Sequence, residues 1–294
     1  MGKRVGIIGL DTSHSVAFAQ LFNEPDAPAA LGGFKVVAAF PEGSRAITSV
    51  IKNIPANIKK LEGLGITMVE SIERLLAVCD VVLLETNDGN MHLEQALPVI
   101  DARKPLFIDK PLACSATDAE AIFAAASRHA VPVFSSSALR FVRGMEEIRK
   151  GNYGKVLGAE TFSPCYLEPS HPDLYWYGIH GVEMLYAIMG TGCSKLTRMH
   201  TRDTDMIMGE WADGRLGGFR GTRSGPADFG GTVFTEKGNI PAGKFEGYQL
   251  LVAAIARFFE TGISPVGQAE TIEICRFIDA AEESKRNGGA VVVL

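Results

Sequence analysis

Hydrophobic residues divide this chain into two parts that differ in periodicity. In the first part, short apolar runs alternate with segments in which apolar residues recur every three or four positions, the patterns of buried strands and amphipathic helices. The alternation predicts a doubly wound, Rossmann-like parallel sheet with helices on both faces. The predicted strands are residues 5–10, 35–40, 66–69 (the weakest), 81–85, 106–109 and 131–134, and the predicted helices are residues 15–22, 71–78, 91–102 and 115–129.

After about residue 136 the pattern changes to longer strands joined by Asp-Gly and Gly-rich turns. We therefore expect an α/β protein of two domains: residues 1–136 form the Rossmann-like domain, and residues 137–294 form an α+β domain with an open, mostly antiparallel sheet. In an alternative arrangement, the last helices pack on the first domain. In this part, strands are predicted at 156–162, 195–201, 205–210, 215–220, 231–235 and 290–293, and helices at 143–150, 179–189, 248–259 and 269–286.

Composition and charge exclude several classes of partner. The 294 residues, 46% of them apolar, are sufficient for two hydrophobic cores. A net charge of −5, a pI near 5.7 and scattered basic residues argue against a nucleic-acid partner. The apolar runs are strand-sized and interrupted by charges, and the initial Met-Gly-Lys-Arg leads directly into a strand. We expect neither a membrane span nor a signal peptide, and a cytoplasmic location.

The five cysteines lie far apart and form no Cys-x-x-Cys pair, so the sequence predicts neither a disulfide framework nor a zinc knuckle. Most are expected to be small core residues. Cys165 precedes a polar loop and is the one candidate for reactivity. A structural role is favoured there, because no cation close in sequence would stabilise a thiolate.

The segment after the first strand, Gly9-Leu-Asp-Thr-Ser-His14, resembles a dinucleotide-binding turn in which only the first of three glycines remains. Asp11 and His14 occupy the positions of the other two. A carboxylate at Asp11 should repel a phosphate, yet Asp11, Thr12 and Ser13 are good helix N-caps, and a helix N-terminus attracts anions. The turn therefore predicts either a modified nucleotide pocket or a lost one.

Ligands of open parallel sheets bind at the carboxyl ends of the strands. After the second strand, the acid that usually binds the adenosine ribose is missing from the strand end. Glu42 can substitute for it, or Ser44 and Arg45 can hold a 2′-phosphate and favour NADP. An ordinary turn is an equally good interpretation of this segment.

Two further strand ends carry polar side chains. Glu85-Thr86-Asn87, followed by His92, comes after the strand at 81–85. Asp109-Lys110-Pro111 ends the strand at 106–109. A lysine at this place can bond a substrate hydroxyl and assist proton and hydride transfer.

The strand spacing, Asp109-Lys110-Pro111-Leu112-Ala113 and the later Gly178-Ile179-His180 together resemble the glucose-fructose oxidoreductase, inositol dehydrogenase and MocA family of NAD(P)-dependent oxidoreductases, over essentially the whole chain. The resemblance implies NAD or NADP as cofactor and a catalytic or substrate-binding role for Lys110. The family turn against the nicotinamide corresponds to Thr86-Asn87 and His92, without its proline, and the family's Arg-Phe pair corresponds to Arg140-Phe141. The implied cofactor-binding residues are Gly9, Asp11, Thr12, Ser13, His14, Ser44, Arg45, Glu85, Thr86, Asn87, His92, Asp109 and Lys110.

The family's catalytic Asp-x-x-x-His matches this chain only at the histidine, His180. The resemblance implies that His180 removes the hydroxyl proton, but Trp176 stands where the aspartate would be. An imidazole can act as a base without that aspartate if another group orients it. Asp173 or Glu183 are the candidates.

The loop before His180 is rich in residue types that bind polyols through hydrogen bonds and aromatic faces. We expect it to form the substrate wall. A metal site from Glu168, His171, Asp173 and His180 is the competing interpretation, but the spacing matches no known motif, so no metal ligands are assigned. The expected substrate-binding residues are Arg140, Glu168, His171, Trp176 and Tyr177.

These features predict an oxidoreductase that transfers hydride between a nicotinamide and a hydroxyl-bearing carbon of a sugar, cyclitol or related polyol. Lys110 would polarise the substrate oxygen and His180 would accept its proton. Two alternatives stay open: a binding or regulatory protein that has lost nucleotide binding, and an NAD-retaining lyase or hydrolase. The resemblance also implies a homo-oligomer, a dimer or tetramer.

Overall fold

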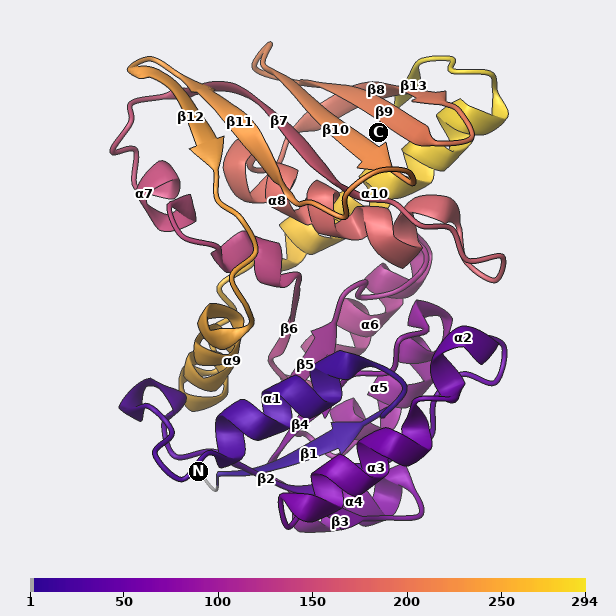
Figure 1. Cartoon of the computed structure of the whole chain (residues 1–294), viewed down its shortest axis with the longest axis vertical. Coiled ribbons are helices and arrows are strands. Elements are labelled where there is room, and N and C mark those ends of the chain that lie inside the picture. Colours follow the sequence, from indigo (N-terminus) through magenta and orange to yellow (C-terminus); the bar gives the residue numbers. More distant parts are fainter. Residues whose placement is uncertain (1–2) are drawn as a thin grey trace. The chain divides into compact units, whose positions relative to one another are not determined.

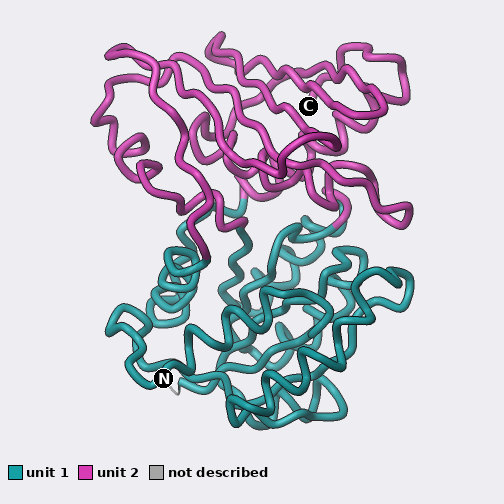
Figure 2. Tube along the Cα trace, in the orientation of Figure 1, with its two compact units in different colours: residues 1–113, 117–136, 248–268 teal, residues 114–116, 137–247, 269–294 magenta. Residues whose placement is uncertain are grey.

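The computed structural model describes residues 3–294, so the first two residues of the initial Met-Gly-Lys-Arg segment lie outside it. The chain forms two compact units, coloured separately in Figure 2. Unit 1 comprises the residues up to Ala113 together with Thr117–Ser136 and Tyr248–Gln268. Unit 2 comprises Cys114–Ala116, Ser137–Gly247 and Ala269–Leu294.

Unit 1 contains a six-stranded sheet in the order β3-β2-β1-β4-β5-β6, with every strand pair parallel (Figure 1). This confirms the predicted parallel sheet. The central strands are buried along their whole length, which explains their continuous apolar sequences. The strands are β1 (Arg4–Ile8), β2 (Lys35–Phe40), β3 (Thr67–Met68), β4 (Val81–Leu84), β5 (Leu106–Asp109) and β6 (Val133–Ser136).

The strand order of this sheet changes direction between β1 and β4, which is the place where open α/β sheets bind ligands. Helices α1, α4 and α5 pack against the strands on either side of that point. The helical elements of unit 1 are α1 (Ser13–Asn23), η1 (Ala29–Leu31), α2 (Thr48–Ile51), α3 (Ile54–Gly63), α4 (Ile72–Val78), η2 (Gly89–Met91), α5 (His92–Asp101), α6 (Ala116–His129) and α9 (Gln249–Thr261).

Helices α2 and α3 were not predicted. In α3, Ile54, Ile58 and Leu61 have helical spacing, but only Asn57 and Leu61 are buried. Pro55 in its first turn was the available signal, since proline is favoured there.

Unit 2 contains a seven-stranded sheet in the order β12-β11-β7-β10-β9-β8-β13. The predicted antiparallel sheet is confirmed except that β7 and β10 pair in parallel. The unpredicted edge strand β12 is mostly exposed and contains Pro241, so it has neither apolar alternation nor a full set of donors. The strands are β7 (Val156–Pro164), β8 (Cys193–His200), β9 (Thr204–Trp211), β10 (Leu216–Thr222), β11 (Gly230–Thr235), β12 (Gly238–Ala242) and β13 (Val292–Val293).

The buried helix α8 packs against β7 and β10 of this sheet (Figure 1). Gly181 permits this close approach, because a Cβ at that position would overlap the Phe219 ring. The π-helical turn η4 leads directly into α8, where we had expected a loop. The helical elements of unit 2 are η3 (Ala138–Phe141), α7 (Met145–Arg149), η4 (Leu174–Gly178), α8 (Ile179–Met189) and α10 (Gln268–Arg286).

None of the helices in residues 3–294 combines the length and the apolar content that a membrane crossing requires.

Candidate functional site

The turn after β1 keeps the backbone of a nucleotide-binding turn at its first glycine. Gly9 has a φ of +88°, and a Cβ there would overlap the backbone of Thr86, so the turn requires glycine at this position. Helix α1 then starts at Ser13, with the Thr12 hydroxyl accepting a hydrogen bond from the His14 N–H as its N-cap. The helix N-terminus therefore opens at the carboxyl edge of the sheet.

Asp11, at the second glycine position, is completely buried. Its Oδ1 accepts a hydrogen bond of 3.0 Å from the Asn87 N–H, and its carboxyl group packs so closely on Gly43 that a Cβ there would overlap it. Burial raises the pKa of Asp11, although the backbone donor at Asn87 opposes this change. The carboxyl group is thus held against the loops that follow β2 and β4.

The residues expected to hold a 2′-phosphate lie in different environments. Ser44 is buried and donates a hydrogen bond of 2.5 Å to Asp88 Oδ2. Arg45 is exposed and forms an ion pair of 3.3 Å with Glu42. The Ser44 hydroxyl and the Arg45 guanidinium are therefore both committed to carboxylates.

His92 connects the loops that follow β4 and β5. Its ring is buried, with Nε2 at 2.7 Å from the Thr86 carbonyl and Nδ1 at 2.9 Å from the Pro111 carbonyl. Burial lowers the pKa of His92, against the hydrogen bonds to these carbonyls. His92 therefore holds the loop that carries Lys110, while the Thr86 hydroxyl beside it is buried without a partner among the described residues.

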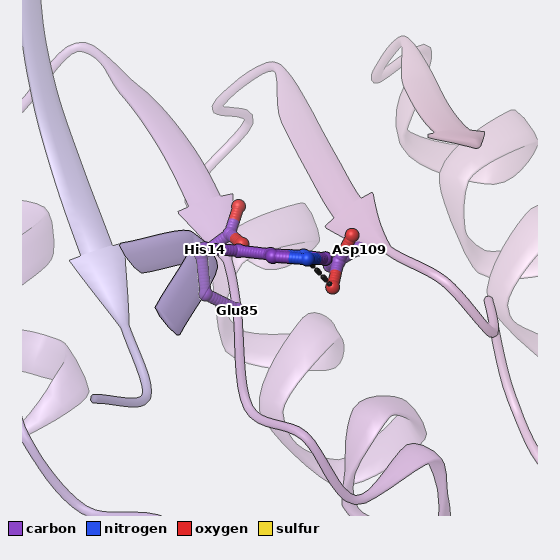
Figure 3. A group of neighbouring side chains, drawn as sticks. All are labelled: His14, Glu85 and Asp109. Carbon is purple, nitrogen blue, oxygen red and sulfur yellow. Dashed lines mark hydrogen bonds and ion pairs between the residues drawn. The ribbon is translucent and has the colours of Figure 1, made fainter. Parts of the chain in front are cut away.

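Two carboxyl groups and one imidazole meet at the ends of β4 and β5 (Figure 3). His14 Nδ1 lies 2.8 Å from Asp109 Oδ2, and ligand atoms of His14, Glu85 and Asp109 all lie within 4.8 Å of one another. Burial, and then the charge of Asp109, raise the pKa of Glu85 well above its ordinary value, while Lys110 opposes the change. Lys110 itself is 6% exposed, directly after β5.

His180 lies in the first turn of α8, as predicted, but the residue that forms a hydrogen bond with its ring was not predicted from the sequence. Its Nδ1 lies 2.8 Å from the hydroxyl oxygen of Ser137, a residue that comes directly after β6. The edges of Tyr177 and Phe229 lie against the same ring, with centroids at 5.2 and 5.8 Å. No sequence motif links Ser137 to His180, since the two residues are 43 positions apart.

The expectation that Asp173 or Glu183 orients His180 is wrong, because both carboxylates bind cations elsewhere. Asp173 forms ion pairs with Arg198, at 3.0 Å, and with Lys285. Glu183 pairs with Arg140 at 3.1 Å, and burial raises its pKa to about 7. The Arg140–Glu183 pair is buried, and the pairs that Asp173 forms are partly exposed.

Of the expected substrate-binding residues, Arg140 is 2% exposed and is bound by Glu183 and Glu270. The rest lie on the segment before α8. The His171 ring packs on Trp176 with centroids 5.0 Å apart, and Tyr177 packs on Tyr166 at 5.1 Å. The segment thus presents partly exposed aromatic rings next to His180, with Glu168 also partly exposed.

The side chains proposed as an alternative metal site, Glu168, His171, Asp173 and His180, are not gathered at one point in the structure. Within residues 3–294, the three potential metal ligands that lie close together are His14, Glu85 and Asp109. Cys165 is buried, and burial raises its pKa to about 12, as expected of a structural cysteine.

Comparison with known proteins gives one family match and many similar structures. Residues 3–137 match the model of the GFO_IDH_MocA oxidoreductase family, described as an NAD-binding Rossmann fold. No curated protein sequence matches the chain.

The whole chain superposes on solved structures of low sequence identity. A probable dehydrogenase from Thermotoga maritima is 17% identical, with a TM-score of 0.78 over 99% of this chain and 98% of that one. A myo-inositol 2-dehydrogenase from Lactobacillus plantarum is 14% identical, with a TM-score of 0.79 over 100% of both chains. A scyllo-inositol dehydrogenase from Lactobacillus casei, with bound NAD(H) and scyllo-inositol, is 12% identical, with a TM-score of 0.77 over 100% and 99%. At these identities the likeness establishes the fold.

Proposed function

We propose that this protein, whose residues 3–137 match the model of the GFO_IDH_MocA family of NAD-binding Rossmann oxidoreductases, oxidises or reduces a hydroxyl-bearing carbon of a cyclitol, sugar or related polyol. The observation that carries the proposal is Lys110, a buried lysine at the carboxyl end of β5 in the sheet that matches the family. The protein would act in the cytoplasm.

The residues of the turn after β1 fit a dinucleotide. The positive φ of Gly9 sets the bend against Thr86, the start of α1 supplies backbone donors for a diphosphate, and the unpartnered Thr86 hydroxyl can bond a ribose. When bound, the nicotinamide supplies or accepts the hydride. Asp11 Oδ1 accepts a hydrogen bond from the Asn87 N–H, and Oδ2 is buried without a partner among the described residues, so this carboxyl group is the feature of the turn that would oppose a diphosphate.

We further propose NAD rather than NADP as the cofactor. A 2′-phosphate needs cationic or hydroxyl donors that are free to bind it. Ser44 is already bonded to Asp88, which follows β4, and Arg45 is paired at the surface with Glu42, so a 2′-phosphate would meet a carboxylate at each of these two donors.

Lys110 would bond the substrate oxygen and stabilise the negative charge that develops on it. His180 would exchange the hydroxyl proton at Nε2. For this, Nδ1 carries its hydrogen and donates it to the Ser137 hydroxyl, which fixes the ring and its tautomer. Ser137 would then do what the family aspartate, replaced here by Trp176, does elsewhere.

A polyol is the proposed substrate class because the segment before α8 combines exposed aromatic faces with polar groups. Trp176 and Tyr177 offer rings for the C–H face of a sugar or cyclitol, and Glu168 and His171 offer hydrogen-bonding groups. The inositol dehydrogenases among the similar structures are consistent with this class.

We also propose a homo-oligomer. Three apolar side chains on the unit 2 sheet are about half exposed or more: Leu157, Leu216 and Met199 are 50%, 55% and 72% exposed. Light scattering on the purified protein tests this.

The test of the function is a turnover assay with NAD and a panel of cyclitols and sugars, followed at the absorbance of reduced nicotinamide. Lys110→Met and His180→Asn should each lower kcat by about 10²- to 10⁴-fold, the usual contribution of a positioned acid or base. Both should bind NAD almost as the wild type does. Unchanged turnover in Lys110→Met would refute the mechanism.

A further inference from the structure

The cluster of His14, Glu85 and Asp109 draws its members from three separate elements. His14 lies in the first turn of α1, Glu85 follows β4 and Asp109 is the last residue of β5. Figure 3 shows the three side chains gathered at the ends of these strands. Their ligand atoms lie within 4.8 Å of one another. The fold itself therefore brings one imidazole nitrogen and two carboxylates to a single point.

Glu85 has no partner at that point. Its side chain is fully buried, and neither carboxylate oxygen has a hydrogen-bond partner in the part of the chain that the structure describes. A buried carboxylate is strongly destabilising unless a cation or several donors compensate it. Two buried carboxyl oxygens without a hydrogen-bond donor therefore indicate that the site binds a cation, to which these oxygens would donate their lone pairs.

Asp205, a buried carboxylate beside the exposed imidazole of His200, shows how a buried acid is compensated elsewhere in this protein. Asp205 accepts from His200 at 2.7 Å and from Arg198 at 2.8 Å, and it also pairs with Arg223. Two guanidinium groups thus neutralise that carboxylate. At Glu85, by contrast, neither carboxyl oxygen has a partner among the described residues, although the Asp109 carboxylate lies close by.

We propose that His14, Glu85 and Asp109 form a binding site for a divalent transition-metal ion, Mn²⁺ or Zn²⁺. Imidazole together with carboxylates suits these ions, whereas Mg²⁺ prefers oxygen ligands alone and retains its waters. Bonds of about 2.1 Å place ligand atoms about 3–3.5 Å apart. His14 Nδ1 and Asp109 Oδ2 lie 2.8 Å apart and all three ligand atoms lie within 4.8 Å of one another, so an ion would replace the hydrogen between His14 and Asp109 and the side chains would shift to receive it. Three protein ligands leave a further coordination position open for water.

The inference goes beyond the proposed hydride transfer and does not depend on it. The experiment is a calorimetric titration of chelator-treated protein with MnCl₂, ZnCl₂ and MgCl₂ in the absence of nucleotide and substrate. One Mn²⁺ or Zn²⁺ should bind per chain, at least about 100-fold more tightly than Mg²⁺. The Mn²⁺ electron paramagnetic resonance spectrum should change on binding.

Two variants and a matched control locate the site. Glu85→Gln should weaken the metal at least about 100-fold while keeping the side-chain volume. His14→Phe should do the same while keeping the ring contacts with Phe18 and Tyr248. His200→Asn, which alters an exposed imidazole beside the buried Asp205 carboxylate, should bind metal as the wild type does.

The metal-free melting temperature of each variant checks that it is folded. Glu85→Gln should melt no lower than the wild type, because it removes a buried carboxyl group that has no partner among the described residues. Absence of stoichiometric binding to the wild type overturns the site, and so does wild-type affinity in both folded variants. Turnover measured in excess chelator tests the proposed function separately.

Discussion

Replacing Glu183 by glutamine is expected to remove a pH dependence from the free energy of unfolding. Glu183 is fully buried beside Arg140, and burial raises its pKa from 4.5 to about 7 in spite of that cation. The folded protein therefore holds a proton that the unfolded chain releases as the pH rises above 4.5. The stabilisation is complete below that pH and is lost as the pH rises through about 7.

A difference of about 2.5 pH units corresponds to about 3 kcal/mol, of which roughly 2 to 3 kcal/mol falls between pH 5 and pH 8. The wild type should lose this amount relative to Glu183→Gln over that range. The assay is urea unfolding followed by circular dichroism at several pH values. Glu283→Gln, an exposed change on α10, is the matched control and should run parallel to the wild type. Parallel curves for Glu183→Gln and the wild type would mean that Glu183 stays ionised on Arg140, and would refute the reasoning.

Three further changes test the site. Gly9→Ala should destabilise the protein by about 1–3 kcal/mol, measured by urea unfolding, and abolish NAD binding in calorimetry, because φ is positive and Thr86 blocks the Cβ; normal binding would contradict the required turn. Ser137→Ala should lower kcat about tenfold with little change in KM and shift the pH–rate profile, since it frees the His180 ring; an unaltered profile would exclude the positioning role. Asp11→Asn should tighten NAD binding about threefold or more by removing a buried charge near the diphosphate; weaker binding would show that the carboxyl group itself is needed.

The fold of unit 1 could be predicted because its strands are buried on both faces and therefore have continuous apolar sequences. β4, with all four residues buried, is the clearest case. α3 was not predicted although Ile54, Ile58 and Leu61 have helical spacing; only Leu61 of these three is fully buried, so the helix contributes little to the core. In unit 2, β12 could not be predicted, because it contains Pro241 and because an exposed edge strand has no alternation of apolar and polar residues.

The candidate site could be predicted only where its residues are neighbours in sequence. Lys110 directly follows a recognisable strand, and the turn at Gly9 carries its own signature. The partner of His180 could not be inferred, because Ser137 is brought to it by the packing of η3 on α8. Glu85 had a position at a strand end, but nothing in the sequence indicated that its carboxyl group would be buried beside His14.

The most direct test of hydride transfer follows a single hydrogen atom. The enzyme is incubated with NAD and a cyclitol or sugar carrying deuterium on the carbinol carbon, and the nucleotide and the product are analysed by mass spectrometry. The account predicts reduced nucleotide that contains the deuterium, formed in proportion to the ketone product. Product that forms while the nucleotide stays oxidised and free of deuterium would contradict it.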